Sequence, residues 1–355
     1  MDEGDQIKLM NECIDRFNRY VLSQNMDNMP IGLFHGKMGV SIYLFHQARL
    51  TKDIKYEKFA KKILDSIYDQ ININSNIDLE NGLIGVCLGI NYLLDKEFLK
   101  GNVNNVLADL DDIIYKNFIA LLATVNEHNS NYIFKSFWEY ILYFSIRLEN
   151  RKLNNNLRYI YENVVITAIN QIEEMGHMSD KFSEPTSFSI NGYFIPNYMF
   201  ILSQVYKLDF YNYKIDKILD EMSDKVLSTY PLLQSSKLLL IAGMKKILRS
   251  NSLPKWEEHV KLLETKIDTQ NLINEEFSNK EIYIHSGISG LYFVLNKFFE
   301  SDAIKSDELR NKIVSSNHWD LFLKNGYLSS FNSIGLVSGL SGAILIYQQE
   351  VFVQI

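Results

Sequence analysis

A pair of glycines separated by two residues recurs along this chain, each time directly before an apolar run. The four full copies are Gly36–Gly39, Gly82–Gly85, Gly287–Gly290 and Gly339–Gly342. Recurrence of this kind indicates an internal repeat, which constrains the fold more than any single motif does. Because glycine admits positive φ and close backbone approach, each copy predicts a tight turn that leads into a helix.

The segments between the glycine turns alternate in character. Spacing of apolar residues at three and four predicts amphipathic helices at residues 6–24, 55–73, 103–122, 155–175, 211–228, 256–267 and 306–322. Helices that are apolar on most faces are expected at residues 40–50, 86–94, 134–148, 193–206, 238–248, 290–299 and 343–352. No alternating strand pattern competes with these helices.

The period of the repeat predicts the architecture. Equivalent points divide the chain into seven units of roughly 50 residues, at Gly36, Gly82, Trp138, Gly192, Gly243, Gly287 and Gly339. The third, fourth and fifth units have lost the full glycine pattern. A helix that is apolar on most faces must be buried on both sides, whereas an open solenoid leaves one side polar. The sequence therefore predicts an all-α fold, a single (α/α) toroid domain over residues 1–355 with two concentric layers of helices.

Composition and charge exclude several classes of protein. A hydrophobic fraction of 46% and a charged fraction of 22% are typical of soluble globular proteins. The net charge of −7, with no basic stripe, argues against a nucleic-acid partner. No apolar run is long enough to span a membrane, and the acidic start lacks the pattern of a signal peptide. Two cysteines, Cys13 and Cys87, give no disulfide framework, so a cytoplasmic setting is expected.

The phased turns resemble one known family. The matching pieces are Phe34-His35-Gly36-Lys37-Met38-Gly39, Asn81-Gly82-Leu83-Ile84-Gly85 with Gly89, and the two copies Ser286-Gly287-Ile288-Ser289-Gly290 and Ser338-Gly339-Leu340-Ser341-Gly342. With their recurrence, the whole chain resembles the lanthionine synthetase C-like (lanthionine cyclase) family. The resemblance implies a role in ribosomal peptide maturation, as in lantibiotic biosynthesis, where cysteine thiols of a peptide add to dehydroalanine or dehydrobutyrine.

The resemblance also implies a zinc ion held by two cysteines and one histidine near the last two inner helices. Thiolates bind zinc well, and the metal lowers the pKa of the incoming thiol. In this sequence His285 stands where the first cysteine is expected, and Val337 and Ser338 stand where the Cys-His pair is expected. Asn191 stands where the family has its acid/base histidine. The usual ligands are absent, so no cofactor is expected.

The sequence nevertheless offers candidate catalytic residues. His35, at the first glycine turn, is interpreted either as a base or peptide contact or as a residue that stabilises the turn. His285, at a position aimed inward in this family, is the second candidate, and Asn191 is the third. A rebuilt metal site from His285, His35 and Cys87 is an alternative. A buried, small hydrophobic role is the other interpretation of Cys87.

Other polar residues are candidates for contacts in a central cavity. Lys37 either attracts an anion at a helix N-terminus or is a solvated turn residue. Glu139, on an apolar helix, needs a partner or a raised pKa. The remaining candidates, which either line a polar mouth or act as caps, are Tyr193, Tyr283, Ser286 and Ser338.

Several further residues are expected to have no functional role. The acidic pair Asp111-Asp112 is interpreted as a solvated outer face. The other histidines are expected to be structural or solvated: His46, His128, His177, His259 and His318.

Three functions remain open. The first is a lanthionine cyclase-like protein that binds a peptide, or a peptide-modifying partner protein, in a central cavity without zinc-dependent cyclisation. The second is a cyclase or other peptide-modifying enzyme with a rebuilt site. The third is a glycan-active (α/α) barrel, which needs two inward carboxylates. The inner turns are poor in Asp and Glu, which argues against the third.

Overall fold

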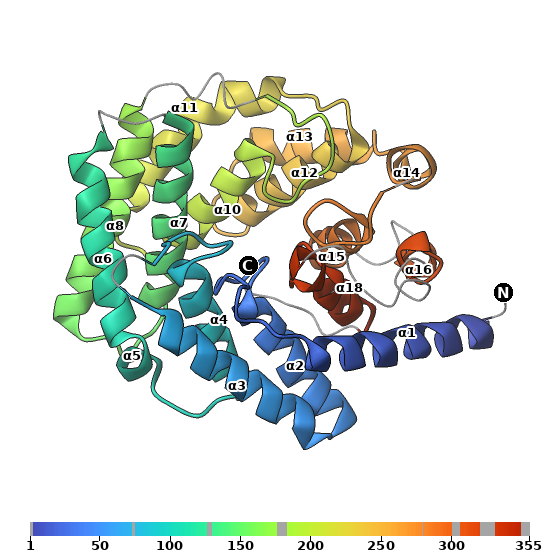
Figure 1. The fold of residues 1–355 in the computed structure, drawn as a ribbon. Coiled ribbons are helices and arrows are strands. Elements are labelled where there is room, and N and C mark those ends of the chain that lie inside the picture. Colours follow the sequence, from blue (N-terminus) through green and yellow to red (C-terminus); the bar gives the residue numbers. More distant parts are fainter. Residues whose placement is uncertain are drawn as a thin grey trace. The chain divides into compact units, whose positions relative to one another are not determined.

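A computed structural model describes the chain at residues 3–72, 75–125, 130–175, 183–278, 280–299, 306–319 and 331–348. Within these ranges the chain is helical and contains no β-strand (Figure 1). None of the described helices combines the length and the apolar character that a membrane span needs.

The alternation of two helix types is confirmed. The amphipathic helices are α1 (Glu3–Ser23), α3 (Ile54–Gln70), α6 (Ala108–Ala123), α8 (Asn155–Glu174), α11 (Asn212–Ser228), α13 (Pro254–Glu264) and α16 (Ser306–Val314). The apolar helices are α2 (Lys37–Thr51), α4 (Leu83–Asp95), α7 (Ser130–Leu148), α10 (Phe194–Tyr206), α12 (Gln234–Leu248), α15 (Ile288–Phe298) and α18 (Leu340–Tyr347). Most apolar helices begin two to four residues earlier than expected, because the turn residues already have helical geometry.

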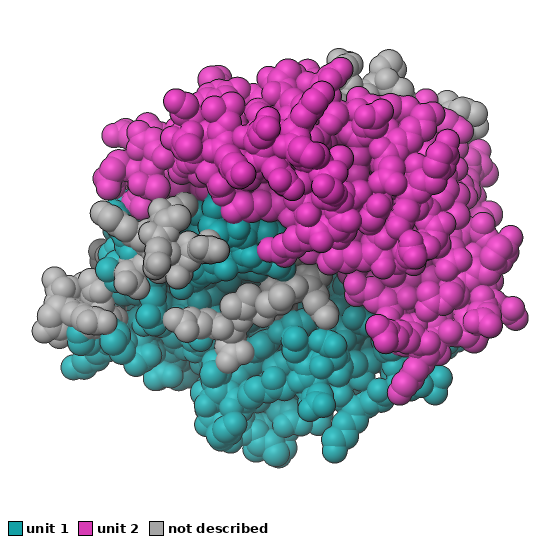
Figure 2. Space-filling view, turned by 180° about the vertical axis from the view of Figure 1, so that it is seen from behind, with its two compact units in different colours: residues 1–110, 279–355 teal, residues 111–278 magenta. Residues whose placement is uncertain are grey.

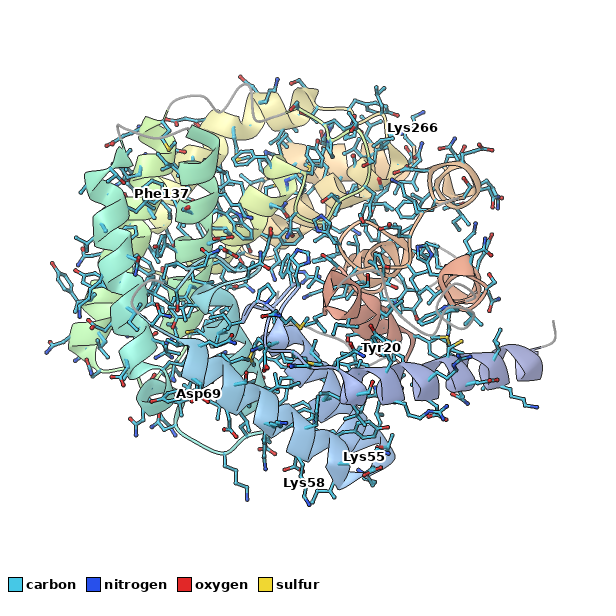
Figure 3. All side chains as sticks on the ribbon, viewed as in Figure 1. Tyr20, Lys55, Lys58, Asp69, Phe137 and Lys266 are labelled. Carbon is cyan, nitrogen blue, oxygen red and sulfur yellow. The ribbon has the colours of Figure 1, made fainter. Side chains whose placement is uncertain are left out.

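Burial separates the two helix types as the sequence predicts. Helix α2 buries every residue from Lys37 to Gln47. Helix α3 buries one stripe, which contains Tyr56 and Ile63, and it exposes Lys55, Lys58 and Asp69 on the opposite face (Figure 3). Each fully buried large apolar side chain contributes about 1.5–3 kcal/mol to folding. The apolar helices therefore supply most of the core.

The internal contacts divide the chain into two compact units. Unit 1 contains residues 1–110 and 279–355, and unit 2 contains residues 111–278 (Figure 2). All four full glycine turns belong to unit 1. The third, fourth and fifth repeats, which lack the full glycine pattern, belong to unit 2. The expectation of one domain over residues 1–355 stays a prediction.

In unit 1, the first and last apolar helices are joined by a buried amide network. Gln47 of α2 donates from Nε2 to Oε1 of Gln348, directly after α18, at 2.7 Å. Asn18 of α1 donates to Gln47 Oε1 at 3.4 Å and accepts from the Tyr43 hydroxyl at 2.6 Å. Because these groups are buried, their bonds fix the register between segments 301 residues apart in the sequence.

In unit 2, neighbouring apolar helices pack directly on one another. Ser203 of α10 donates its hydroxyl to the carbonyl of Lys246 in α12 at 3.0 Å. A Cβ at Gly243 of α12 would lie 2.8 Å from Cα of Pro196 in α10. The fifth repeat therefore needs a glycine at position 243, although this glycine lies within α12 and not at the start of the helix.

Two local features differ from the expectation. The helix predicted at residues 103–122 is divided into α5 (Val103–Val106) and α6, because Leu107 leaves the helical geometry and buries its side chain completely. The short segments α14 (Thr269–Asn271), the π-helix η2 (Leu272–Glu276) and the 3₁₀ helix η3 (Phe331–Ile334) have no counterpart among the predicted elements.

Candidate functional site

Three apolar helices of unit 1, α2, α4 and α15, begin with the same arrangement of backbone hydrogen bonds. The first helical N–H groups donate to carbonyls seven residues earlier, so that the preceding segment folds back over the helix N-terminus. Three such bonds, each at 2.8 Å, run from Lys37 to Pro30, from Leu83 to Asn76 and from Ile288 to Glu281. The backbone itself therefore satisfies helix-start donors that usually need a capping side chain.

Close backbone approach explains the glycines. Gly287, the residue before α15, has a φ of −126°, which any residue adopts. A Cβ on Gly287 would overlap the carbonyl oxygen of Glu281, and a Cβ on Gly342 would overlap that of Leu336. The predicted tight turns are confirmed, and of the two reasons given for glycine it is the lack of a side chain that applies at these positions.

Backbone hydrogen bonds connect the four glycine turns of unit 1 to one another. Phe34 in the first turn donates to the carbonyl of Glu80 in the second at 3.0 Å. Val337 in the seventh donates to the carbonyl of Phe34 at 3.2 Å, and it accepts from the N–H of His285 in the sixth at 2.9 Å. Val337 thus bridges the segments that carry the two candidate histidines, His35 and His285.

Four predicted site residues lie in these connected turns. His35 and His285 are partly buried, as are Ser286 and Ser338, which neighbour the bonded residues in sequence. The structure therefore brings the segments of these four side chains together within unit 1. Serine hydroxyls and imidazoles accept and donate hydrogen bonds, so this group is chemically suited to bind polypeptide backbone or to move protons.

Tyr283, another predicted site residue, lies at the same turn and contacts a histidine from elsewhere. Its ring packs edge-to-face on His318, with 5.7 Å between centroids. His318 Nδ1 lies 3.0 Å from the hydroxyl of Ser316. Burial raises the pKa of the Tyr283 hydroxyl, and the charge of Glu281 raises it further. His318, expected to have no functional role, is therefore part of the surroundings of the sixth turn.

The environment of Lys37 matches neither of the two interpretations, an anion-attracting residue or a solvated turn residue. Its side chain is fully buried, and Nζ donates to Ser66 of α3 at 2.8 Å and to the carbonyl of Asp27 at 3.5 Å. Burial lowers the pKa of Lys37, and the charge of Asp27 partly opposes this. The α2 amides expected to attract an anion are bonded to backbone carbonyls. In this structure Lys37 anchors the loop before His35 to α3.

The remaining predicted site residues lie in unit 2. Glu139 of α7 is buried, and its Oε1 is 3.9 Å from Nζ of Lys135 one turn earlier, which supplies the expected partner. Asn191 is exposed. Tyr193, directly before α10, is fully buried, and burial raises its pKa, with a further contribution from Glu184.

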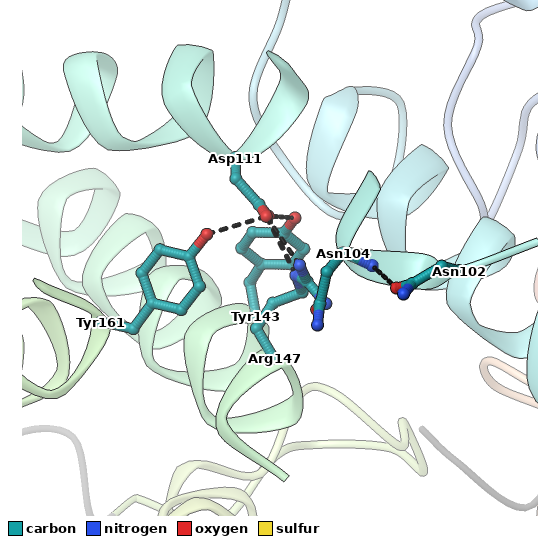
Figure 4. A network of polar contacts seen from close by, with 6 residues as sticks. All are labelled: Asn102, Asn104, Asp111, Tyr143, Arg147 and Tyr161. Atoms are coloured by element: carbon teal, nitrogen blue, oxygen red, sulfur yellow. Dashed lines mark hydrogen bonds and ion pairs between the residues drawn. The ribbon is translucent and has the colours of Figure 1, made fainter. Parts of the chain in front are cut away.

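Asp111 is not on a solvated outer face, and this corrects the sequence-based expectation. Its carboxylate is buried and accepts from Nη2 of Arg147 at 2.8 Å and from the hydroxyl of Tyr161 at 2.8 Å (Figure 4). Tyr143 donates to the same carboxylate. Burial lowers the pKa of Arg147, but the hydrogen bonds and charge of Asp111 outweigh that effect and raise it. Asp112, the next residue, is exposed as expected.

Two of the other histidines, His46 and His259, have the expected structural roles. His46 is buried, with Nε2 2.7 Å from the hydroxyl of Tyr92, and His259 contacts the carbonyl of Thr229 at 3.2 Å. His128 and His177 lie outside the described residues. Cys87 is fully buried in α4, as the interpretation of a small hydrophobic residue requires.

The side chains at the implied zinc positions do not fit that metal. Val337 is buried and has no donor atom, and Ser338 offers only a neutral hydroxyl, whereas zinc prefers thiolate, imidazole and carboxylate. In the part of the chain that the structure describes, no three His, Cys, Asp or Glu side chains come together as metal ligands. The alternative set of His285, His35 and Cys87 is therefore not assembled.

The all-helical fold and the connected glycine turns define the class: this is a protein with the α/α toroid fold of lanthionine cyclases. Among solved structures, the chain is similar to nisin cyclase, with a TM-score of 0.57 and 14% sequence identity. The similarity covers 99% of this chain and 95% of nisin cyclase. It establishes the fold, so the predicted fold class is confirmed, and the resemblance to lanthionine cyclases is confirmed at the level of the fold. Neither a family model nor a curated protein matches the sequence.

Proposed function

We propose that this chain is a cytoplasmic lanthionine cyclase-like protein that binds a peptide during ribosomal peptide maturation and does not carry out zinc-dependent thioether cyclisation. The observation that carries the proposal is Val337. It bridges the segments of His35 and His285 by backbone bonds, at the position where the resemblance implies a cysteine ligand. The turns are retained, and the metal chemistry is not.

Donor chemistry supports the part of the proposal that concerns zinc. Activation of a thiol by zinc needs three protein ligands and one open position. Of the three implied positions, only His285 offers a good donor. A single imidazole does not hold zinc against its hydration shell, so no step of the proposed function involves a metal.

The polar side chains at the connected turns support the binding of a peptide. His35, His285, Ser286 and Ser338 are partly buried, so part of each residue remains exposed at the connected turns. The main-chain amides and carbonyls of a bound peptide are suitable partners for such groups. The fold is that of nisin cyclase, whose name describes action on a peptide.

A second candidate function is a metal-free enzyme that uses both histidines. It is favoured by the same bridge, because the Val337 N–H bonds the peptide group between Phe34 and His35, and its carbonyl bonds His285. Two imidazoles on turns that are bonded together supply the general acid and base that such an enzyme needs.

A binding and thiol assay separates the two functions. Purified protein is mixed with dehydrated, cysteine-containing peptides, and binding and free thiol content are measured with and without added zinc. The proposal expects binding that weakens in Ser338→Ala and His285→Ala, with no loss of free thiols. Loss of thiols with the unchanged protein would reject the non-cyclising function, and its absence in His35→Ala and His285→Ala would favour the enzyme.

A further inference from the structure

In unit 2, one carboxylate is held between two consecutive backbone amides. Glu184 Oε2 accepts from the N–H of Leu232, and Oε1 accepts from the N–H of Leu233, each at 2.7 Å. Leu233 directly precedes α12, and its φ of −72° and ψ of 138° are extended. We call this pair of N–H groups the amide clamp.

The amide clamp is not needed to cap α12. A second carboxylate, that of Glu276, accepts from the N–H of Ser235 in the first helical turn at 3.2 Å and from the Ser235 hydroxyl. The positive end of the helix stabilises carboxylates in both places. Glu184 can therefore leave the amide clamp while Glu276 still satisfies the first turn of α12.

Two buried hydroxyls of unit 2 also bear on this region, one of them in the first turn of α12. Ser236 and Tyr193 are at most 1% exposed, and within the described residues neither hydroxyl has a hydrogen-bond partner. Ser236 is the third residue of α12, and Cβ atoms in a helix tilt toward its N-terminus, so the Ser236 side chain lies at the end of the helix that follows the amide clamp. Burial raises the pKa of the Tyr193 hydroxyl, and the charge of Glu184 raises it further.

Unpaired hydroxyls at such burial are rare in folded proteins and indicate a missing partner. A hydroxyl donates readily to a carboxylate, so Ser236 and Tyr193 suit the same kind of ligand as the amide clamp does. They constitute evidence for a ligand that is independent of the contacts made by Glu184.

The surface next to the amide clamp carries exposed apolar side chains, with the buried Lys237 behind one of them. Leu232 is 85% exposed and Tyr230 is 51% exposed. Nζ of Lys237 lies 5.2 Å from the centroid of the Tyr230 ring. Consecutive backbone amides beside an apolar surface are a recurrent way of capturing a peptide carboxylate. The exposed Leu232 and Tyr230 offer contacts for the residues that precede such a carboxylate.

We propose that the amide clamp binds a carboxylate of a peptide and that Glu184 occupies it when no such peptide is present. The inference depends on the proposed function only for the kind of partner, a peptide. The site is in unit 2 and uses none of the residues proposed for peptide binding in unit 1.

Glu184 then regulates binding through competition within the chain. The apparent affinity of a ligand is its intrinsic affinity multiplied by the fraction of molecules whose site is open. Because Glu184 is tethered next to the amide clamp, that fraction is small. A peptide with a free C-terminal carboxylate and one with a glutamate side chain present the same chemistry.

The test compares fluorescein-labelled pentapeptides by anisotropy. One has a free C-terminal carboxylate, one is amidated and carries a single glutamate, and one is amidated without a carboxylate. Glu184→Ala is expected to bind at least one of the two carboxylate peptides at least about ten-fold more tightly than the unchanged protein does. The peptide without a carboxylate gains nothing. Glu258→Ala, which removes an exposed charge from α13, leaves all affinities unchanged.

A second variant tests the amides themselves. Leu233→Pro removes one N–H of the amide clamp at a φ that proline adopts, so α12 is retained, as circular dichroism should confirm. In the Glu184→Ala background it should abolish the gain. A ¹⁵N-leucine spectrum of Glu184→Ala checks the site independently, because the Leu232 and Leu233 amide signals should shift with the carboxylate peptide.

Three results would overturn the inference: no gain in Glu184→Ala, an equal gain for the peptide without a carboxylate, or unshifted Leu232 and Leu233 signals. Any of them leaves the proposed function intact if His285→Ala still weakens peptide binding. Conversely, a gain in Glu184→Ala with no effect of His285→Ala supports the amide clamp and removes the proposed site in unit 1.

Discussion

The carbonyl of Val337 accepts a hydrogen bond of 2.9 Å from the N–H of His285, so the sixth and seventh glycine turns are bonded at the positions where a zinc site is implied. The backbones of these turns are bonded together, but Val337 and Ser338 carry no good zinc donor. A change of side chains alone should therefore be able to restore a metal site.

We predict that the triple variant His285→Cys, Val337→Cys, Ser338→His binds zinc with one ion per chain, because it supplies the thiolates and imidazole that zinc prefers on turns already bonded together. Metal analysis after dialysis measures the stoichiometry. The matched control His285→Ala, Val337→Cys, Ser338→His lacks one ligand and should lose most of its zinc. Stoichiometric zinc in the unchanged protein would contradict the prediction.

Gly342 should tolerate no side chain. A Cβ there overlaps the carbonyl of Leu336, so Gly342→Ala should lower the free energy of unfolding by about 1–3 kcal/mol or more. Gly101→Ala is the control, because its Cβ would meet only the flexible side chains of Val106 and Leu94, and it should change stability by about 0.5 kcal/mol or less. Urea denaturation measures both. Equal effects would show that the backbone at Gly342 adjusts without cost.

Much of the fold could be predicted from the sequence because its signals are local. A buried helix such as α2 must be apolar on most faces, and a turn such as that at Gly287 must lack a side chain. Both requirements produce sequence patterns with a fixed spacing. The burial of Asp111 produces no such pattern, because an acidic pair looks the same on an exposed helix. The partners of Asp111, Arg147 and Tyr161, lie 36 and 50 residues away in the sequence.

The candidate site was harder to predict for the same reason. The sequence identified His35 and His285, but the bridge between their turns is made by the backbone of Val337, which no side-chain pattern reports. Lys37 has the sequence context of an exposed turn residue, and its burial is explained by Ser66, 29 residues later, together with the carbonyl of Asp27. The amide clamp is also formed by backbone groups and was not predicted.

Removing one partner of the buried ion pair in unit 2 should be severe. Asp111→Ala leaves the Arg147 guanidinium, which is 1% exposed, without its carboxylate, and a change of this kind costs about 3–5 kcal/mol. The double variant Asp111→Leu, Arg147→Met removes both charges and should be less destabilised than Asp111→Ala. Asp112→Ala, on the exposed neighbour, is the control and should change stability by about 0.5 kcal/mol or less. Chemical denaturation that ranks the double variant below Asp111→Ala would refute this account.

Lys37 should make the stability of the protein depend on pH in the alkaline range. Burial lowers its pKa in the folded state below the usual lysine value of 10.5, whereas in the unfolded chain the ammonium is solvated. Between the lowered pKa and 10.5 the unfolded state binds more protons, so this residue makes the free energy of unfolding rise with pH in that window. Lys37→Met removes the titration and should flatten the rise, as urea denaturation from pH 8 to pH 10.5 would measure. Lys58→Met, on the exposed face of α3, should leave the rise in place. A profile for Lys37→Met parallel to that of the unchanged protein would mean that Lys37 is solvated when it titrates.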